Sequence, residues 1–137
     1  MSSYVLDTSV AVAWYLEEVF SPAARRWQDR MLEGKAIFIV PSLHYWEFAN
    51  VLRTLTWRRE LEEDLAREIL DLHLEAPLEQ SEPDRRTVLD TAIEYGATAY
   101  DAVFISLCLS RGSPLITAEK TTTPWVAKLR DQVETVR

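Results

Sequence analysis

Short apolar runs alternate along this chain with longer segments that have helical periodicity. Three runs rich in β-branched or aromatic residues predict buried strands at residues 4–6, 37–40 and 114–117. Segments 76–80 and 132–136 are candidates for an edge strand and a last strand. Apolar spacing and start and stop residues predict helices at about 9–16, 21–34, 43–57, 60–74, 81–96, 101–111 and 124–130. This alternation predicts an α/β fold, with a mainly parallel central sheet between helices, as one domain over residues 1–137.

Apolar stripes predict which face of each helix points inward. The expected stripe of helix 60–74 is Leu61, Leu65, Ile69 and Leu72, and that of helix 81–96 is Val88, Leu89, Ala92 and Ile93. Helix 43–57 has a stripe of Tyr45, Phe48, Ala49, Leu52 and Leu55, and further apolar residues away from it, namely Leu43, Trp46 and Val51. A helix that is apolar on more than one side is either central or meets another subunit.

Composition and charge narrow the class of protein. The chain has 137 residues, one cysteine and a net charge of −7. Cys108 lies in an apolar run and is expected to be a buried apolar side chain. Because no apolar run is long enough to span a bilayer, we expect no membrane association and a cytoplasmic location. Net negative charge opposes nonspecific nucleic-acid binding, yet 22 carboxylates permit a cluster that a divalent cation neutralises.

Four carboxylates stand out by position. Asp7 ends the first strand and Glu119 follows the strand at 114–117, so both are expected at the carboxyl edge of the sheet. Asp101 precedes a helix that is apolar nearly all round, and Glu47 lies between Trp46 and Phe48. Each has a simpler explanation: a helix cap for Asp7 and Asp101, and an exposed charge for Glu47 and Glu119.

Carboxylates that converge at one place repel each other unless a cation neutralises them. Mg²⁺ and Mn²⁺ prefer oxygen ligands, and such a site suits hydrolysis of a phosphodiester by an activated water. The four acids together therefore indicate a metal-dependent nuclease.

Four short segments in order resemble the PIN-domain family, and within it the VapC toxins of toxin–antitoxin pairs. They are Val5–Ser9, Trp46–Asn50, Tyr100–Phe104 and Leu115–Glu119, and their spacing fits the family over essentially the whole chain. The resemblance implies a PIN-like three-layer sandwich, with helices on both sides of the sheet. It also implies an RNA endonuclease that depends on Mg²⁺ or Mn²⁺, forms a homodimer and is covered by a separate antitoxin protein.

The resemblance also assigns roles to individual residues. Asp7, Glu47 and Asp101 match the family's metal-binding acids, and Glu119 matches a fourth acid that is usually Asp. Matches to polar positions that orient the acids or the substrate are Thr8, Ser9, Asn50 and Thr117. The acidic net charge favours a basic antitoxin. The pairs Arg58-Arg59 and Arg25-Arg26 are candidates for RNA phosphate contacts, with solvated helix faces as the alternative.

Other roles are less well supported. His44 and His73 lie on separate predicted helices without a visible partner, so both are expected to be structural. Trp14, Trp27 and Trp46 are expected in the core, whereas Trp57 and Trp125 near helix ends are candidates for base stacking.

Three alternative classes share parts of the pattern. A phosphatase of the haloacid-dehalogenase type needs a second Asp where this chain has Ser9, and a receiver domain needs paired acids near the first strand. A catalytically inactive PIN-like binding module remains an alternative that only an assay excludes.

Overall fold

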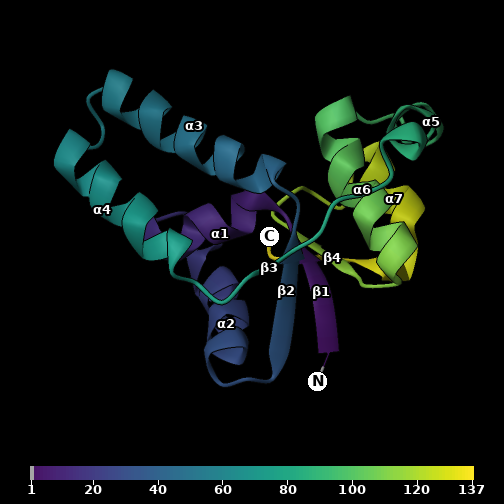
Figure 1. Ribbon diagram of the computed structural model, residues 1–137, viewed down its shortest axis with the longest axis horizontal. Coiled ribbons are helices and arrows are strands. Elements are labelled where there is room, and N and C mark those ends of the chain that lie inside the picture. The colour runs from purple at the N-terminus through teal and green to yellow at the C-terminus, as the bar shows by residue number, and fades with distance from the viewer. Residues whose placement is uncertain (1) are drawn as a thin grey trace.

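The computed structural model describes residues 2–137, which form the predicted alternation of strands and helices (Figure 1). The strands are β1 (Ser2–Leu6), β2 (Ala36–Val40), β3 (Glu79–Gln80), β4 (Leu115–Thr117) and β5 (Val133–Thr135). The helices are α1 (Thr8–Tyr15), α2 (Ser21–Leu32), α3 (Leu43–Trp57), α4 (Glu63–Leu74), α5 (Arg85–Tyr95), α6 (Ala99–Arg111) and α7 (Pro124–Leu129). A short 3₁₀ turn, Arg130–Gln132, precedes β5.

The five strands form one sheet in the order β3-β2-β1-β4-β5, and every neighbouring pair is parallel. The predicted fold class is confirmed, with a sheet that is wholly rather than mainly parallel. Parallel neighbours need crossover connections, and the helices between the strands supply them.

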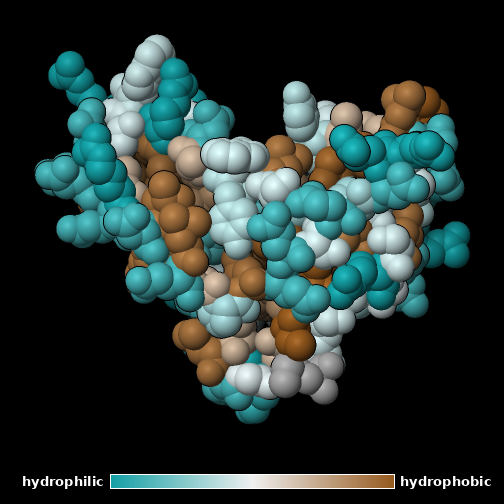
Figure 2. Space-filling view, in the orientation of Figure 1, coloured by the Kyte–Doolittle hydropathy of each residue, from teal (hydrophilic) through white to brown (hydrophobic). Residues whose placement is uncertain are grey.

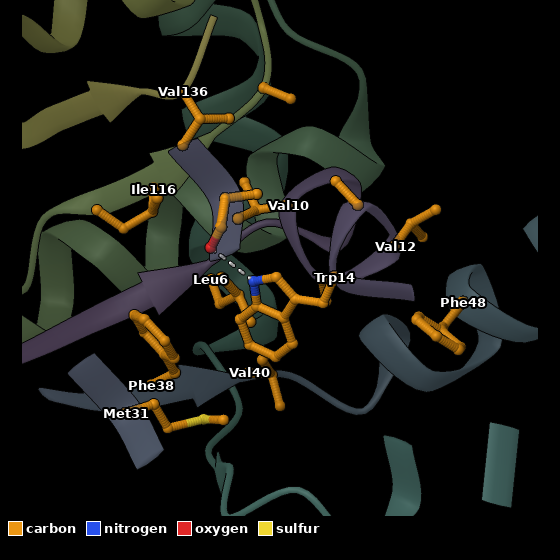
Figure 3. Close-up of a cluster of buried hydrophobic side chains, with 14 of the residues drawn as sticks. Leu6, Val10, Val12, Trp14, Met31, Phe38, Val40, Phe48, Ile116 and Val136 are labelled. Carbon is orange, nitrogen blue, oxygen red and sulfur yellow. Dashed lines mark hydrogen bonds between the residues drawn. The ribbon is translucent and has the colours of Figure 1, made fainter. Parts of the chain in front are cut away.

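Alternating side chains of the central strands enter two separate cores, as the two-residue period of a strand requires. On one face, Leu6, Phe38 and Ile116 pack with residues of α1 to α4, including Trp14 and Phe48 (Figure 3). On the other face, the buried residues are Val5, Ile39 and Leu115 from the sheet and Phe104, Ile105 and Trp125 from α6 and α7. Helices therefore cover both faces, which confirms the three-layer sandwich.

Two predicted inward stripes are partly wrong. Leu65 and Leu72 of α4 are exposed, and so are Leu89 and Ile93 of α5. The residues that these helices bury are instead Ala66, Ile69 and His73 in α4, and Thr91 and Ala92 in α5. The buried faces of α4 and α5 thus consist largely of small or polar side chains. Hydrophobicity alone cannot identify a buried face of that composition. The expected buried Cys108 is confirmed.

Two tryptophans are also placed differently from the prediction. Trp46 is 73% exposed, so it is not in the core, and Trp125 is 4% exposed, so it cannot stack on a base. Trp125 lies at the start of α7 and packs into the second core. Trp57 is exposed, at the end of α3.

No single helix within residues 2–137 is long and apolar enough to cross a membrane. By length and composition alone, α5 and α6 together pass that test as a pair bent by 106°.

Ile105→Ala should lower the free energy of unfolding by about 2–5 kcal/mol, because Ile105 is fully buried between α6 and the sheet and its loss leaves a cavity. The matched control is Ile93→Ala in α5, where the side chain is 73% exposed, and it should change stability by less than about 0.5 kcal/mol. Urea unfolding of both variants provides the measurement. Equal losses would contradict the assignment of α6 to the core.

Candidate active site

The carboxyl ends of β1 and β4 bring Asp7 and Thr117 together. Thr117 Oγ1 donates a hydrogen bond of 2.7 Å to Asp7 Oδ2, and Ser9 Oγ donates one of 3.2 Å to the same oxygen. Asp7 precedes α1 but makes no side-chain capping hydrogen bond, so a helix cap does not account for it. The neighbouring hydroxyls hold the carboxylate at the edge of the sheet.

Glu47 reaches the same region from the second turn of α3. Its Oε1 accepts a hydrogen bond of 2.9 Å from Oγ1 of the buried Thr8, the first residue of α1. The Glu47 side chain is partly buried, between the exposed Trp46 and the buried Phe48. The alternative of a freely exposed Glu47 is therefore wrong.

Asp101 lies in the first turn of α6 and is partly buried. The cap of this helix is Thr98, whose hydroxyl accepts a hydrogen bond of 3.1 Å from the Asp101 backbone N–H. The helix begins two residues earlier than predicted, so its cap does not account for the Asp101 carboxylate.

Glu119 follows β4 and is exposed, as the simpler explanation held. Its backbone N–H donates to Thr117 Oγ1 at 3.1 Å, and its Oε2 accepts a hydrogen bond of 3.3 Å from Thr123. It therefore lies next to the hydroxyl that holds Asp7.

Burial and neighbouring negative charges raise the pKa values of three of these acids. Burial, together with the charges of Asp101 and Glu119, raises the pKa of Asp7 to about 6, although hydrogen bonds from Thr117 and Ser9 oppose the shift. Burial, together with the charges of Asp7 and Asp101, raises the pKa of Glu47 to about 7 against the Thr8 hydrogen bond. Burial and the charge of Glu119 also raise the pKa of Asp101. Acids from four segments distant in sequence therefore lie close enough for their charges to affect the site.

The donor set fits a hard divalent cation. All four groups are carboxylates, and within residues 2–137 none of them forms a salt bridge with Lys, Arg or His. In the same residues, no three His, Cys, Asp or Glu side chains are arranged to hold an ion directly. Mg²⁺ usually keeps several waters and takes one or two carboxylates, so one or two direct ligands with water between the rest suit this arrangement.

The other predicted site residues divide into two groups. Thr8, Ser9 and Thr117 contact the acids, and Ser9 Oγ also accepts a hydrogen bond from the Ala118 backbone N–H at 3.2 Å. Asn50 is exposed on α3, one turn beyond Glu47.

Arg58 and Arg59 are not near the acids. They are exposed just beyond the end of α3, and Arg58 lies about 16 Å along the helix axis from Glu47. Any contact they make with RNA is therefore distant from the carboxylates.

Both histidines have partners that the sequence analysis missed. His44 and His73 are fully buried, their Nε2 atoms are 2.7 Å apart, and His44 Nδ1 lies 3.0 Å from Thr8 Oγ1. A signal was available in the sequence. α3 and α4 are antiparallel and joined by a short turn near residue 59, so the start of α3 lies beside the end of α4. His44 is at the first of these ends and His73 at the second.

The PIN domain family model matches residues 4–121 of this chain. This match includes all four carboxylates and most of the sheet. The chain belongs to the PIN domain family. Members of this family are generally nucleases. No curated protein sequence matches the chain significantly.

Two solved structures share the fold along nearly the whole chain. PAE2754 from Pyrobaculum aerophilum superposes with a TM-score of 0.75 at 22% identity, over 98% of this chain and 84% of that one. VapBC2 from Rickettsia felis, bound to a DNA fragment from their promoter, superposes with a TM-score of 0.67 at 13% identity, over 97% and 98%. At these identities the likeness shows the PIN fold.

Asp7→Asn should stabilise the metal-free protein by about 1–2 kcal/mol at pH 7.5. The raised pKa means that the folded state binds this proton more tightly than the unfolded state. Stability is therefore lost as the pH rises from 3.8 to about 6, and the advantage of the variant should be smaller at pH 5 than at pH 7.5. Urea unfolding in EDTA at both pH values measures this.

The matched control is Asp29→Asn, at an exposed position of α2, which should behave like the wild type at both pH values. A destabilised Asp7→Asn protein at pH 7.5 would show that burial and the neighbouring charges do not penalise the ionised Asp7.

Proposed function

We propose that this PIN domain is a metal-dependent endoribonuclease and the toxin component of a VapBC-type toxin–antitoxin pair. The observation that carries the proposal is the convergence of Asp7, Glu47 and Asp101 beside Glu119, where burial and the charges of neighbouring acids raise the pKa values of the first three. Such a centre is unfavourable by itself and becomes favourable when a divalent cation binds.

Asp7, Glu47 and Asp101 would hold Mg²⁺ or Mn²⁺, one or two of them directly and the rest through water, and the more exposed Glu119 would be a further ligand or would orient a water. The bound ion would supply Lewis acidity and an activated water for hydrolysis of the phosphodiester. Thr117 and Ser9 hold the Asp7 carboxylate, while Thr8 holds that of Glu47. By resemblance to the family, the products are a 5′-phosphate and a 3′-hydroxyl.

We expect the RNA backbone to bind in the hollow of the surface next to the acids. The surface is hollowed between the α3–α4 side and the α5–α6 side of the molecule (Figure 2), and the chain passes from β1 into α1 between these two sides (Figure 1). The exposed Asn50 would contact the substrate near the acids, whereas the buried Thr8 would act through Glu47, which corrects its expected role as a substrate contact. Arg58 and Arg59 would bind phosphates farther along α3.

Large exposed apolar residues support the proposed protein partners. They gather on α3, α4 and α5, and include Trp46, Trp57, Leu65, Leu72, Leu74, Leu89 and Ile93. Exposed apolar patches of this kind usually mark protein interfaces. A homodimer and a basic antitoxin segment, attracted by the net charge of −7, would cover them.

The purified protein should cleave RNA with Mg²⁺ or Mn²⁺ and should not do so in EDTA. Asp7→Asn should lower the rate by at least about a thousandfold, since it removes one unit of charge from the centre and hardly changes volume. Gel analysis of a mixed RNA substrate measures this.

Asp29→Asn, purified identically, is the control for contaminating nuclease and for loss of charge elsewhere, and it should retain the wild-type rate. Equal cutting by wild type and Asp7→Asn would contradict the assignment of the acids. Absence of cutting, on RNA of several kinds, would favour an inactive binding module.

The homodimer is tested separately. Light scattering at tens of micromolar should give about twice the chain mass of 15.8 kDa. A mass of one chain at that concentration would contradict the homodimer and leave the exposed residues of α3 and α4 to the antitoxin alone.

A further inference from the structure

A row of hydrogen-bonded side chains runs beneath Glu47 through the first core. His44 lies in the first turn of α3 and His73 in the last turn of α4, and both are fully buried. Their Nε2 atoms are 2.7 Å apart. Burying two imidazoles is costly unless every polar atom finds a partner, so the contacts of the other ring nitrogens decide what the pair does.

Each histidine has a second partner on its other nitrogen. The Tyr15 hydroxyl, at the end of α1, lies 2.9 Å from His73 Nδ1. Thr8 Oγ1, at the start of α1, lies 3.0 Å from His44 Nδ1 and donates to Glu47 Oε1 at 2.9 Å. Five side chains from three helices thus form one unbroken row that ends at a carboxylate of the site.

Proton counting allows one order in this row. With the Glu47 carboxyl ionised, the Thr8 hydroxyl gives its single proton to Glu47, so its oxygen must accept from His44 Nδ1–H. A neutral imidazole has one N–H, which leaves His44 Nε2 as an acceptor. His73 must therefore donate from Nε2, and its Nδ1 accepts from the Tyr15 hydroxyl.

The surroundings keep both rings neutral. Phe48 stacks on His73 with ring centroids 4.1 Å apart, and Trp14 and Tyr15 meet it edge-on. Burial lowers the pKa of His73 to about 4, and burial with the neighbouring His73 lowers that of His44 to about 3. At neutral pH each ring then has one proton, as the row requires.

Tyr15 favours one direction of the row. Two neutral histidines that share one hydrogen bond can exchange donor and acceptor roles. In the opposite order, His44 Nδ1 would be an acceptor and would compete with Glu47 for the only proton of Thr8. In that order the Tyr15 hydroxyl would accept from His73 Nδ1–H, and its own proton would have no acceptor side chain or carbonyl within residues 2–137. Donation from Tyr15 to His73 Nδ1 therefore favours the first order, and buried networks with every group paired are rigid.

We propose that Tyr15, His73 and His44 are positioning residues. Their hydrogen bonds make the Thr8 hydroxyl donate to Glu47, and this bond holds the Glu47 carboxylate beside Asp7 and Asp101. The proposal rests on the proposed function for its consequence, since a held Glu47 matters because it would ligate a cation. Within residues 2–137, no hydrogen bond joins any of these three residues to the acids. The row lies behind Glu47, a candidate metal ligand. Hydrogen-bond partners of metal ligands orient those ligands toward the ion.

The proton order can be read directly from imidazole ¹⁵N NMR spectra of the metal-free protein at about pH 8.5, where Glu47 is ionised, because the chain has only two histidines. The expected result is His44 protonated on Nδ1 and His73 on Nε2. Tyr15→Phe should mix the two tautomers. Tyr45→Phe is the matched control, since Tyr45 also packs edge-on against His44 but its hydroxyl makes no hydrogen bond within residues 2–137. His44 protonated mainly on Nε2 in the wild type would overturn the proposal.

The effect on the site is measured as Mn²⁺ affinity by calorimetry. Tyr15→Phe should weaken binding by about tenfold and Thr8→Val by at least as much, as for other outer-shell partners. Because both changes act through the Thr8 proton, the double variant should bind no more weakly than Thr8→Val. Additive losses, or unchanged affinity in Tyr15→Phe, would show that the row serves only the fold and would overturn the positioning role.

Failure of the proposed function gives a different result. A wild-type protein that binds no Mn²⁺ would refute the metal site, and with it the consequence drawn here. The NMR spectra would still decide the proton order, because they need neither metal nor RNA.

Discussion

Every strand of the sheet runs in the same direction, and the other features of the molecule depend on this constraint. A parallel sheet is apolar on both faces, so helices must cover both, and here α1 to α4 and α5 to α7 do so. The carboxyl ends of all strands then meet at one edge. Asp7 after β1 and Thr117 in β4 are neighbours there although 110 residues separate them.

That edge concentrates negative charge that the described residues do not neutralise. Thr117, Ser9 and Thr8 hold the carboxylates by hydrogen bonds, but the pKa values of Asp7 and Glu47 remain raised. Folding therefore brings together groups that repel each other when ionised. A site of this kind costs stability in the free protein, and binding of a cation would recover it.

The histidine row shows how the first core supports this edge. α3 and α4 could have packed through apolar side chains alone, yet the contact contains two imidazoles paired with each other, with Tyr15 and with Thr8. Within residues 2–137, the one buried side-chain polar atom without a partner is Ser106 Oγ, far from this row in sequence. The ring nitrogens of both histidines are paired. The row therefore links the first core to the Glu47 carboxylate through hydrogen bonds.

By itself, the sequence determined the order of strands and helices and the parallel sheet, and it singled out four candidate acids, because period, turn residues and strand-end positions are local properties. It did not determine which side of α4 and α5 is buried, since Leu65 and Ile93 are apolar and yet face solvent. It also left the capping alternative for Asp101 open until Thr98 was found in that role. Only the tertiary structure paired His44 with His73 and aligned Thr8 with Glu47, because hydrogen bonds between distant segments depend on how whole helices pack.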